Sequence, residues 1–419
     1  MRTKWVTAVT AVAAVVAVFG AWWALRPALQ APLPTPANRP EERLQDFRDA
    51  LYFPIRELLA GGNPYDPAAM FAHWPVRQAF NLYQPYHLAL HLPFALPGYR
   101  VGAVLFTLFA MVLLVVLTAM AARRLRLQVL VPVIAGTAVL TAFLLLSQVG
   151  KAQLFVGQVN PLLAVGAAGV LLARRDHPRW AAVALGLAWL KPQVGLPLSV
   201  LLLARGSGRV VAGGTAIAAA ASLPVVVLLI ARGGLSSFVD AIVANVDNMR
   251  HTPYGAVDSP TAQRIDLAAV FFRVTGVNVP GAEIPALLAV LAVSVVLVRR
   301  LDRLGDPDSG AVADLLTFLA VFTAIVHQPG DVLYAFPATV VAAAVWWRRR
   351  RDPGWTAFGL AVLALLVPYL HLYAADDAIR SVLGDRAAVT VDGVAVVLCW
   401  GLLAAFAVRL TRRVPEPVP

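Results

Sequence analysis

Two carboxylates in the polar segment after the first apolar run are the side chains best placed for acid–base chemistry. Asp46 and Asp49 occur there within one helical turn, ahead of the turn-forming residues 61–66. A carboxylate takes the proton of a hydroxyl group when it is held beside that group. Because apolar stretches flank the segment, we expect Asp46 just outside a membrane, where it could act on a lipid-borne substrate. The alternative is that both carboxylates belong to a solvated helix face.

Two of the three lysines are also placed where apolar surroundings make a charge unfavourable in free energy. Lys151 and Lys191 lie at the edge of apolar sequence or within it, whereas Lys4 precedes the first apolar run. Ionisable residues at membrane depth are functional-site candidates by default. We therefore expect a functional role for Lys191. For Lys151 that role is weighed against snorkelling of the ammonium group to the membrane surface.

Two amides and a histidine are further candidates. Gln158 and Asn160 stand at the start of a short apolar stretch. Asn160 could cap a helix there or, with Gln158, hydrogen-bond a sugar hydroxyl or a phosphate. His327 and Asp331 share a tight turn between two apolar runs. This pair could bind a sugar, a phosphate or a metal, although one histidine with one carboxylate is a weak metal signal. A capped turn is the alternative.

The composition identifies the class of protein. Apolar residues make up 59% of the 419 residues and charged residues 14%, and the mean hydropathy is +0.73. Repeated apolar runs are long enough to cross a hydrocarbon core of ~30 Å, so we expect an all-α integral membrane protein. With Cys399 as the single cysteine, we expect neither a disulfide framework nor a thiolate metal site. The net charge of +12 fits basic cytoplasmic loops better than nucleic-acid binding.

The apolar runs predict a polytopic helix bundle with about 12 membrane-entering segments and a long first extracytoplasmic loop. The first run is expected to be a retained span rather than a signal peptide, because it is long and lacks a clear cleavage site. We treat residues 1–419 as one transmembrane domain with both termini inside. The predicted segments are 5–25, 100–121, 128–147, 161–173, 180–190, 194–204, 210–230, 283–300, 311–326, 332–347, 355–373 and 391–410.

Residues 180–204 hold Lys191 at their centre. One span through this stretch would invert every later loop and place the arginine cluster at 348–351 outside, against the positive-inside rule. We therefore predict two short helices, 180–190 and 194–204, each about 17 Å long at 1.5 Å per residue. The turn at Lys191 would then lie inside the membrane, an arrangement that often marks a binding site.

Three segments are expected outside the cytoplasm. The first, residues 26–98, contains Asp46 and a predicted amphipathic helix at 41–60, which would lie at the membrane surface or on the bundle. Residues 231–282 and 374–390 form the other two loops. A catalytic site built from the first loop would therefore face away from the cytoplasm.

Several short motifs occur in a fixed order between residues 40 and 340. They are Asp46-Phe47, Leu58-Leu59-Ala60-Gly61-Gly62-Asn63-Pro64-Tyr65-Asp66, Tyr83-Gln84-Pro85, Gly157-Gln158-Val159-Asn160-Pro161, Leu190-Lys191-Pro192-Gln193 and a late His327. This set resembles the bacterial polyprenyl-phosphate-sugar-dependent glycosyltransferases of family 87, which include actinobacterial mannosyltransferases and arabinofuranosyltransferases and have the GT-C fold. The chain departs from the family pattern at Gln84, where a proline is usual, and at Pro329-Gly330 after the histidine.

The resemblance implies an inverting transferase that moves a sugar from a polyprenyl-phosphate carrier to an envelope glycolipid or polysaccharide. Asp46 would be the general base and His327 a second catalytic residue. Lys191, with Lys151 or Arg264, would hold the donor phosphate. The sugar- or acceptor-binding candidates are Asp49, Tyr65, Tyr83, Gln158, Asn160 and Gln193. Mannose is expected before arabinofuranose, in a bacterial plasma membrane, with no cofactor and no required metal.

Two other functions fit parts of the sequence. A transporter or lipid flippase would suit the many spans and an intramembrane Lys191. Against it, we find no convincing internal repeat, and the acidic residues lie almost wholly in the predicted loops. A non-catalytic scaffold of the cell envelope is the third interpretation. Such a protein would bind a sugar-phosphate lipid without turning it over.

Overall fold

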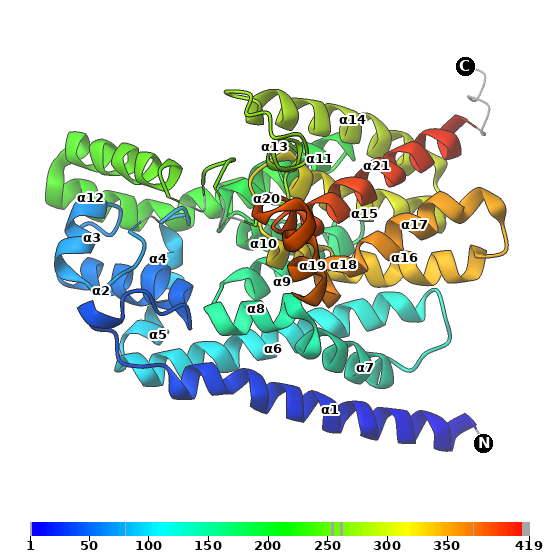
Figure 1. Ribbon diagram of the computed structural model, residues 1–419, viewed down its shortest axis with the longest axis horizontal. Coiled ribbons are helices and arrows are strands. Elements are labelled where there is room, and N and C mark those ends of the chain that lie inside the picture. Colours follow the sequence, from blue (N-terminus) through cyan, green and yellow to red (C-terminus); the bar gives the residue numbers. More distant parts are fainter. Residues whose placement is uncertain (1, 80, 253–254, 260–262, 372, 413–419) are drawn as a thin grey trace.

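Helices form all the regular structure in the part of the chain that the computed structural model describes, residues 2–79, 81–252, 255–259, 263–371 and 373–412 (Figure 1). This follows from the composition. In a hydrocarbon phase an apolar segment satisfies its backbone hydrogen bonds most simply within one helix. The predicted all-α class is confirmed.

Seven helical stretches among the described residues are long and apolar enough to cross a membrane, and a bent helix pair makes an eighth when counted as one span. The chain is therefore a multi-pass membrane protein. The seven are α1 (Arg2–Gln30), α6 (Tyr99–Arg126), α12 (Gly208–Arg250), α14 (Glu283–Leu304), η3 (Pro329–Ala335) with α16 (Phe336–Arg349), η4 (Pro353–Trp355) with α17 (Thr356–Ala364) and α18 (Leu366–Leu370), and α21 (Val391–Arg412). The pair α7 (Val133–Leu146) and α8 (Gln148–Val156) is bent by 66°.

Shorter helices complete the bundle. The segment between α1 and α6 contains η1 (Pro36–Asn38), η2 (Phe47–Tyr52), α2 (Phe53–Leu59), α3 (Pro67–His73), α4 (Tyr86–Leu90) and α5 (Leu92–Ala95). The others are α9 (Asn160–Ala173), α10 (Pro178–Ala188), α11 (Pro192–Ala204), α13 (Leu267–Thr275), α15 (Pro307–Ala324), α19 (Tyr373–Leu383) and α20 (Asp385–Ala388).

The core of the bundle contains α9 and α15. Almost all of α15 is buried, and α9 buries residues on every face of its helix. In contrast, α1 and α12 expose large apolar side chains such as Trp22 and Leu223, as helices in contact with lipid do. Figure 1 shows α1 along one edge of the bundle, where it packs beside α6 and α7.

The predicted break at Lys191 is confirmed. α10 ends at Ala188 and α11 begins at Pro192, whose fixed backbone angle and missing N–H suit a first helical turn. The far ends of the two helices, near Asp176 and at Arg205, line one common cavity. The pair therefore enters the bundle and returns to the same end, and Lys191 lies at the turn.

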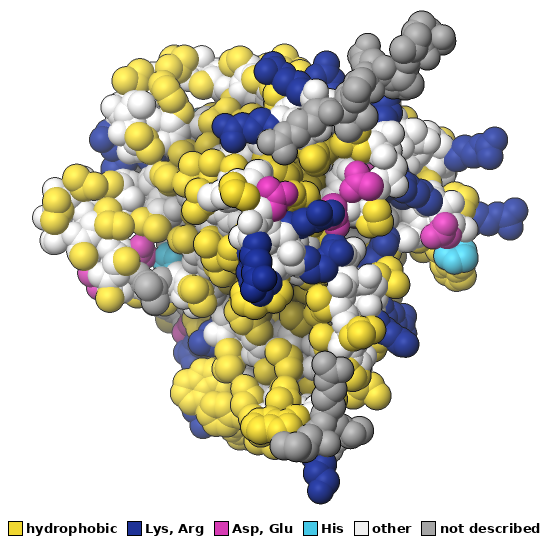
Figure 2. Space-filling view, turned by 90° about the vertical axis from the view of Figure 1, so that its right-hand side faces the viewer, with side chains coloured by type: hydrophobic (Ala, Val, Ile, Leu, Met, Phe, Trp, Pro, Cys, Tyr) yellow, Lys and Arg dark blue, Asp and Glu magenta, His cyan; other side chains and the backbone are white. Residues whose placement is uncertain are grey.

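The end of the bundle at which α1 begins carries clusters of exposed arginines. Figure 1 has the start of α1 and the end of α21 at this end, and Figure 2 shows Lys and Arg side chains spread over it. The positive-inside rule predicts that such an end lies in the cytoplasm. Exposed members of the clusters are Arg123, Arg126, Arg299, Arg300, Arg303, Arg349 and Arg350.

The helix predicted at 41–60 lies on the bundle and is buried more fully than an amphipathic pattern implies. It begins at Phe47 as the π-helix η2 and continues as α2 to Leu59. Its buried residues occupy several faces, because α6 packs aromatic rings against it. Tyr99 and Phe106 lie 5.6 Å and 5.3 Å from the ring of Phe47.

The two later segments that were predicted to lie outside contain helices. α12 continues to Arg250 through a kink at Gly234, whose φ of 84° suits glycine. The added part of α12 holds the Tyr83 segment: Asn245 exchanges two hydrogen bonds with the backbone of Asn81, at 2.7 Å and 2.9 Å. Residues 374–390 contain most of α19 and all of α20.

Candidate active site

A cavity of about 500 Å³ lies where the Asp46 segment meets the turns between membrane helices. Its walls come from η2 and the residues before it, the Tyr83 segment, α8 and the turn after it, the break between α10 and α11, residues 326–331, and the chain after α18. The fold thus brings together residues that are far apart in the sequence. Predicted site residues in the lining are Asp46, Asp49, Tyr83, Gln158, Lys191, Gln193 and His327.

The backbone before Asp46 is held in an uncommon conformation. Leu44 has a φ of 55°, a left-handed value that non-glycine residues rarely adopt, and its N–H donates to the Phe155 carbonyl at 2.7 Å. Asp46 precedes η2 without capping it, so its carboxylate remains available to the cavity. Gly157 closes against this segment, because a Cβ at that position would lie 2.8 Å from Phe47 Cβ.

Burial raises the pKa of Asp46 from 3.8 to about 6. The side chain keeps partial exposure, as a cavity residue does, but protein surrounds it and desolvation disfavours the charged form. Lys191 opposes the shift, whereas Asp49 and Asp331 add to it. A carboxylate with this pKa is ionised at neutral pH and is basic enough to take a proton from a reacting hydroxyl.

Lys191 is the one lysine or arginine among the described residues that lines this cavity. Its Nζ donates to Asn160 Oδ1 at 2.7 Å and lies 3.8 Å from Asp331 Oδ1. The ammonium group is also 5.6 Å from the centre of the Tyr83 ring. An ammonium group has three N–H donors, so Lys191 can bind an anion while it keeps its bond to Asn160.

Asn160 holds a buried hydrogen-bond network behind the cavity wall. Its Nδ2 donates to Gln158 Oε1 and to Asp331 Oδ1, the latter at 2.8 Å. Its Oδ1 accepts from Lys191 and from the Tyr334 hydroxyl, which lies 2.6 Å away. The alternative role as helix N-cap is wrong, because Val159 takes that position. Asn160 instead positions Lys191 and Gln158.

His327 is buried at the cavity with one ring nitrogen unused. Nδ1 lies 2.9 Å from the Ile325 carbonyl and carries the proton donated there, whereas Nε2 has no partner. Burial lowers the pKa of His327, so the ring is neutral at pH 7. In this tautomer Nε2 is a hydrogen-bond acceptor for a hydroxyl group.

Asp49 lines the cavity but is already satisfied by the protein. Its Oδ1 lies 2.7 Å from Arg48 Nε, and its Oδ2 accepts from the N–H groups of Arg77 and Gln78, both at 3.1 Å. This carboxylate therefore ties η2 to the loop after α3.

Within the described ranges, no group of three or more His, Cys, Asp or Glu side chains could hold a metal ion.

Besides Asn160, which lies behind the wall, three predicted site residues do not line the cavity. Lys151 is exposed on α8. Arg264 is buried in an ion pair with Asp266, 2.8 Å between Nε and Oδ2. Tyr65 is also buried, and its hydroxyl donates to the Tyr83 carbonyl at 3.2 Å. Arg264 and Tyr65 therefore hold surrounding structure in place.

The cavity has a second polar wall that the sequence analysis missed. It consists of Gln148, His371, Tyr373 and Asp392. The sequence does contain one signal for this wall. Asp392 begins an apolar run long enough to span the membrane, and a carboxylate in such a helix is costly.

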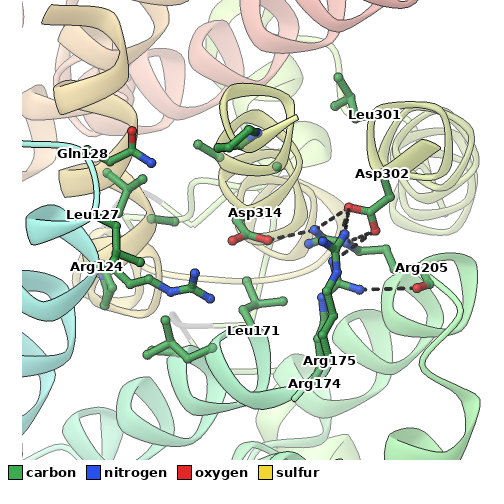
Figure 3. Close-up of a pocket in the computed structure, with 18 of the residues that line it drawn as sticks. Arg124, Leu127, Gln128, Leu171, Arg174, Arg175, Arg205, Leu301, Asp302 and Asp314 are labelled. Carbon is green, nitrogen blue, oxygen red and sulfur yellow. Dashed lines mark hydrogen bonds and ion pairs between the residues drawn. The ribbon is translucent and has the colours of Figure 1, made fainter. Parts of the chain in front are cut away.

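A second cavity, of about 490 Å³, lies at the arginine-rich end. Figure 3 shows Arg174, Arg175 and Arg205 gathered on Asp302, with Arg205 also reaching Asp314. The contacts of Arg205 with the two carboxylates are both 2.8 Å. The two carboxylates offset two of the three positive charges, and the network fastens the ends of the re-entrant pair. α9 runs from one cavity to the other, and its 14 residues rise about 21 Å.

This chain is similar to a known protein family. The model of glycosyltransferase family 87 matches residues 81–329, a range that contains Tyr83, Lys191 and His327 of the cavity and begins after Asp46. No curated protein matches the chain significantly. The match covers more than half of a chain that has seven candidate membrane spans in its described part, and this multi-pass membrane protein therefore belongs to glycosyltransferase family 87.

Proposed function

We propose that this protein transfers a sugar from a polyprenyl-phosphate carrier to a hydroxyl group of an envelope glycolipid or polysaccharide. The observation that carries the proposal is one cavity that holds both a carboxylate with a raised pKa, Asp46, and a single ammonium group, Lys191. The carboxylate is the base that an acceptor hydroxyl needs. The ammonium is a partner for a phosphate.

The reaction is a single displacement at the anomeric carbon of the donor sugar. The acceptor oxygen bonds to this carbon while the bond to the phosphate oxygen breaks, and the acceptor proton passes to Asp46. The carrier leaves as polyprenyl phosphate, a stable anion, so its departure needs electrostatic support and no acid. Attack on the face opposite the phosphate inverts the anomeric configuration. Mannose is the proposed sugar, and arabinofuranose is the second choice.

Lys191 is the proposed support for the leaving phosphate. Its hydrogen bond to Asn160 fixes the ammonium group, and the Tyr83 ring covers one side of it. Because the pair with Asp331 is long, at 3.8 Å, a phosphate oxygen can compete for the same donor. The expected second cations, Lys151 and Arg264, are not in the lining, so Lys191 carries this role alone.

The remaining polar groups of the cavity are proposed to orient the sugar and the acceptor. Gln158 and Gln193 line the cavity and offer amide donors and acceptors. His327 offers Nε2, a buried acceptor without a partner in the protein. Sugar hydroxyls are donors and acceptors at once, so this mixture suits a carbohydrate.

The proposed location is a bacterial plasma membrane, with the cavity open to the extracytoplasmic side. The arginine-rich end of the bundle supports this orientation, because α9 begins at the catalytic cavity and ends at the cavity of that end. The carrier tail would lie among the membrane helices.

A lipid flippase is the second candidate, because broken helices around a charged residue also occur in transporters. Purified protein in lipid vesicles is incubated with radiolabelled polyprenyl-phosphate-mannose and an envelope glycolipid extract, and then with the arabinofuranose donor. Label is expected in a new glycolipid with an inverted linkage. Movement of the labelled carrier across the bilayer without transfer would instead favour the flippase, and binding with neither event would favour a scaffold.

A further inference from the structure

The second polar wall of the cavity contains a histidine held between two carboxylates. His371 Nδ1 lies 2.9 Å from Asp392 Oδ2, and its Nε2 lies 3.0 Å from Asp376 Oδ2. These side chains come from the chain just after α18, from α19 and from the first turn of α21. His371 and Asp392 line the cavity, so the arrangement faces the same space as Asp46.

One oxygen of Asp392 is buried and has no partner in the protein. The Asp392 side chain is 5% exposed, and its Oδ1 makes no hydrogen bond, while Oδ2 is taken by His371. A buried carboxylate oxygen without a donor costs free energy. A ligand that brings a donor into the cavity would recover that cost.

The backbone at His371, which carries this ring, is strained. Its φ of 31° is a left-handed value, and Leu44 is the one other non-glycine residue with positive φ among the residues described. Such strain clusters at functional sites. Both strained residues adjoin this cavity, since Leu44 stands just before Asp46 and His371 is in the lining.

The charges of this wall select the chemistry of its ligand. Two carboxylates face one imidazole ring, so the wall disfavours an anion such as the donor phosphate. Both ring nitrogens of His371 are engaged by carboxylates, which leaves it unable to coordinate a metal at the same time, and no metal-binding group is found in the described ranges. A neutral molecule with hydroxyl donors fits an unpaired carboxylate oxygen.

We propose that Asp392, anchored by His371 and Asp376, is a subsite for the acceptor carbohydrate, whose hydroxyl groups donate to Asp392 Oδ1. This inference rests on the proposed transferase function and specifies where the acceptor binds. The donor phosphate then lies at Lys191 and the acceptor glycan at Asp392, and the reacting hydroxyl reaches Asp46 between them. Asp392 is a binding residue, and His371 and Asp376 are positioning residues.

The test measures sugar binding without any donor. Saturation-transfer NMR on the full chain in lipid nanodiscs gives the Kd of α-mannobiose and of an arabinofuranose disaccharide. Asp392→Asn is expected to weaken binding of at least one disaccharide by about 10- to 100-fold, because a hydrogen bond to a charged group is lost. Asp377→Asn is the matched control, since Asp377 is the neighbouring carboxylate on α19, is 73% exposed and pairs with Arg380.

A second variant guards against misfolding. His371→Asn removes the imidazole anchor and places a residue that tolerates left-handed backbone, so it is expected to fold and still to weaken disaccharide binding. Binding within twofold of wild type in both variants, or no saturation transfer to either disaccharide in wild type, would overturn the subsite. If both variants lose disaccharide binding but the wild-type protein transfers no sugar, the transferase function is refuted and the subsite stands.

Discussion

At the scale of single residues, two neighbouring carboxylates of the cavity, Asp46 and Asp49, have different surroundings. Asp46 is surrounded by protein and by other carboxylates, which makes it a better proton acceptor. Asp49, within one turn of it, is neutralised by Arg48 and by two backbone N–H groups. Burial raises the pKa of both carboxylates, but Arg48 and the two N–H groups occupy Asp49, so Asp46 is the one left available to a substrate.

The rate of transfer should depend on pH through Asp46. The base must be ionised, and burial raises its pKa to about 6, so the rate should rise with pH up to that value and level off above it. We expect kcat/KM to fall about tenfold per pH unit below 6. A profile that is flat down to pH 4.5 would show that no group with a raised pKa is needed in its ionised form.

Replacing Lys191 should weaken donor binding. Lys191→Ala removes the one ammonium group of the cavity and is expected to raise the donor KM about 10- to 100-fold, since hydrogen bonds to charged groups contribute about 1.5–3 kcal/mol. Lys151→Ala is the matched control, because Lys151 is exposed on α8 outside the lining. Equal KM values for the two variants would remove Lys191 as the phosphate partner.

Among the elements, two tight turns position Asp46, the proposed base. The left-handed Leu44 and the left-handed Gly157 face each other, so the C-terminal end of α8 fixes the start of η2. At Gly157 an added Cβ would lie 2.8 Å from Phe47 Cβ and 3.2 Å from Leu44 Cδ2. These contacts are tighter than ordinary packing allows. A side chain at position 157 would therefore force the segment that carries Asp46 to move.

Gly157→Ala tests this arrangement against Gly206→Ala. Both glycines have a φ of 74°, so alanine adds the same backbone strain of about 1–2 kcal/mol at each. Only Gly157 has neighbours within 4 Å of the new Cβ. We therefore expect Gly157→Ala to lose transfer activity at least tenfold more than Gly206→Ala, measured at equal amounts of folded protein. Similar activities would mean that this contact does not position Asp46.

The sequence predicted some elements well because a physical rule constrained them. The break at Lys191 followed from the positive-inside rule and the length of a helix. The extension of α12 to Arg250 did not follow, because it depends on contacts such as that between Asn245 and Asn81. The subsite at Asp392 was also missed, since only the fold brings His371 and Asp376 to it.

At the scale of the whole molecule, the charged side chains differ between the two ends of the bundle. Ion-paired and exposed arginines occupy one end of the bundle, and the carboxylate-lined cavity with its single lysine lies about a helix length away along α9. This asymmetry predicts both the orientation in the membrane and the side on which the acceptor must be presented.

Cysteine labelling in intact cells tests the orientation. Leu59 lies on the segment between α1 and α6 and is 50% exposed, Leu127 lies at the arginine-rich end and is 72% exposed, and the native Cys399 is fully buried. A membrane-impermeant maleimide should label Leu59→Cys in intact cells and Leu127→Cys only after permeabilisation. The opposite result would place the catalytic cavity on the cytoplasmic side.

The central claim is that Asp46 takes the proton of the acceptor hydroxyl, and a single-turnover comparison of wild type with Asp46→Asn tests it most directly. The native pKa of Asp46 is raised, so its contribution to stability is present below its ordinary pKa and is lost as pH rises through about 6. The variant should therefore unfold at no lower temperature than wild type at pH 7.5. We predict unchanged donor binding, with label transfer slowed at least 100-fold through loss of the general base. Transfer at the wild-type rate in this folded variant would contradict the mechanism.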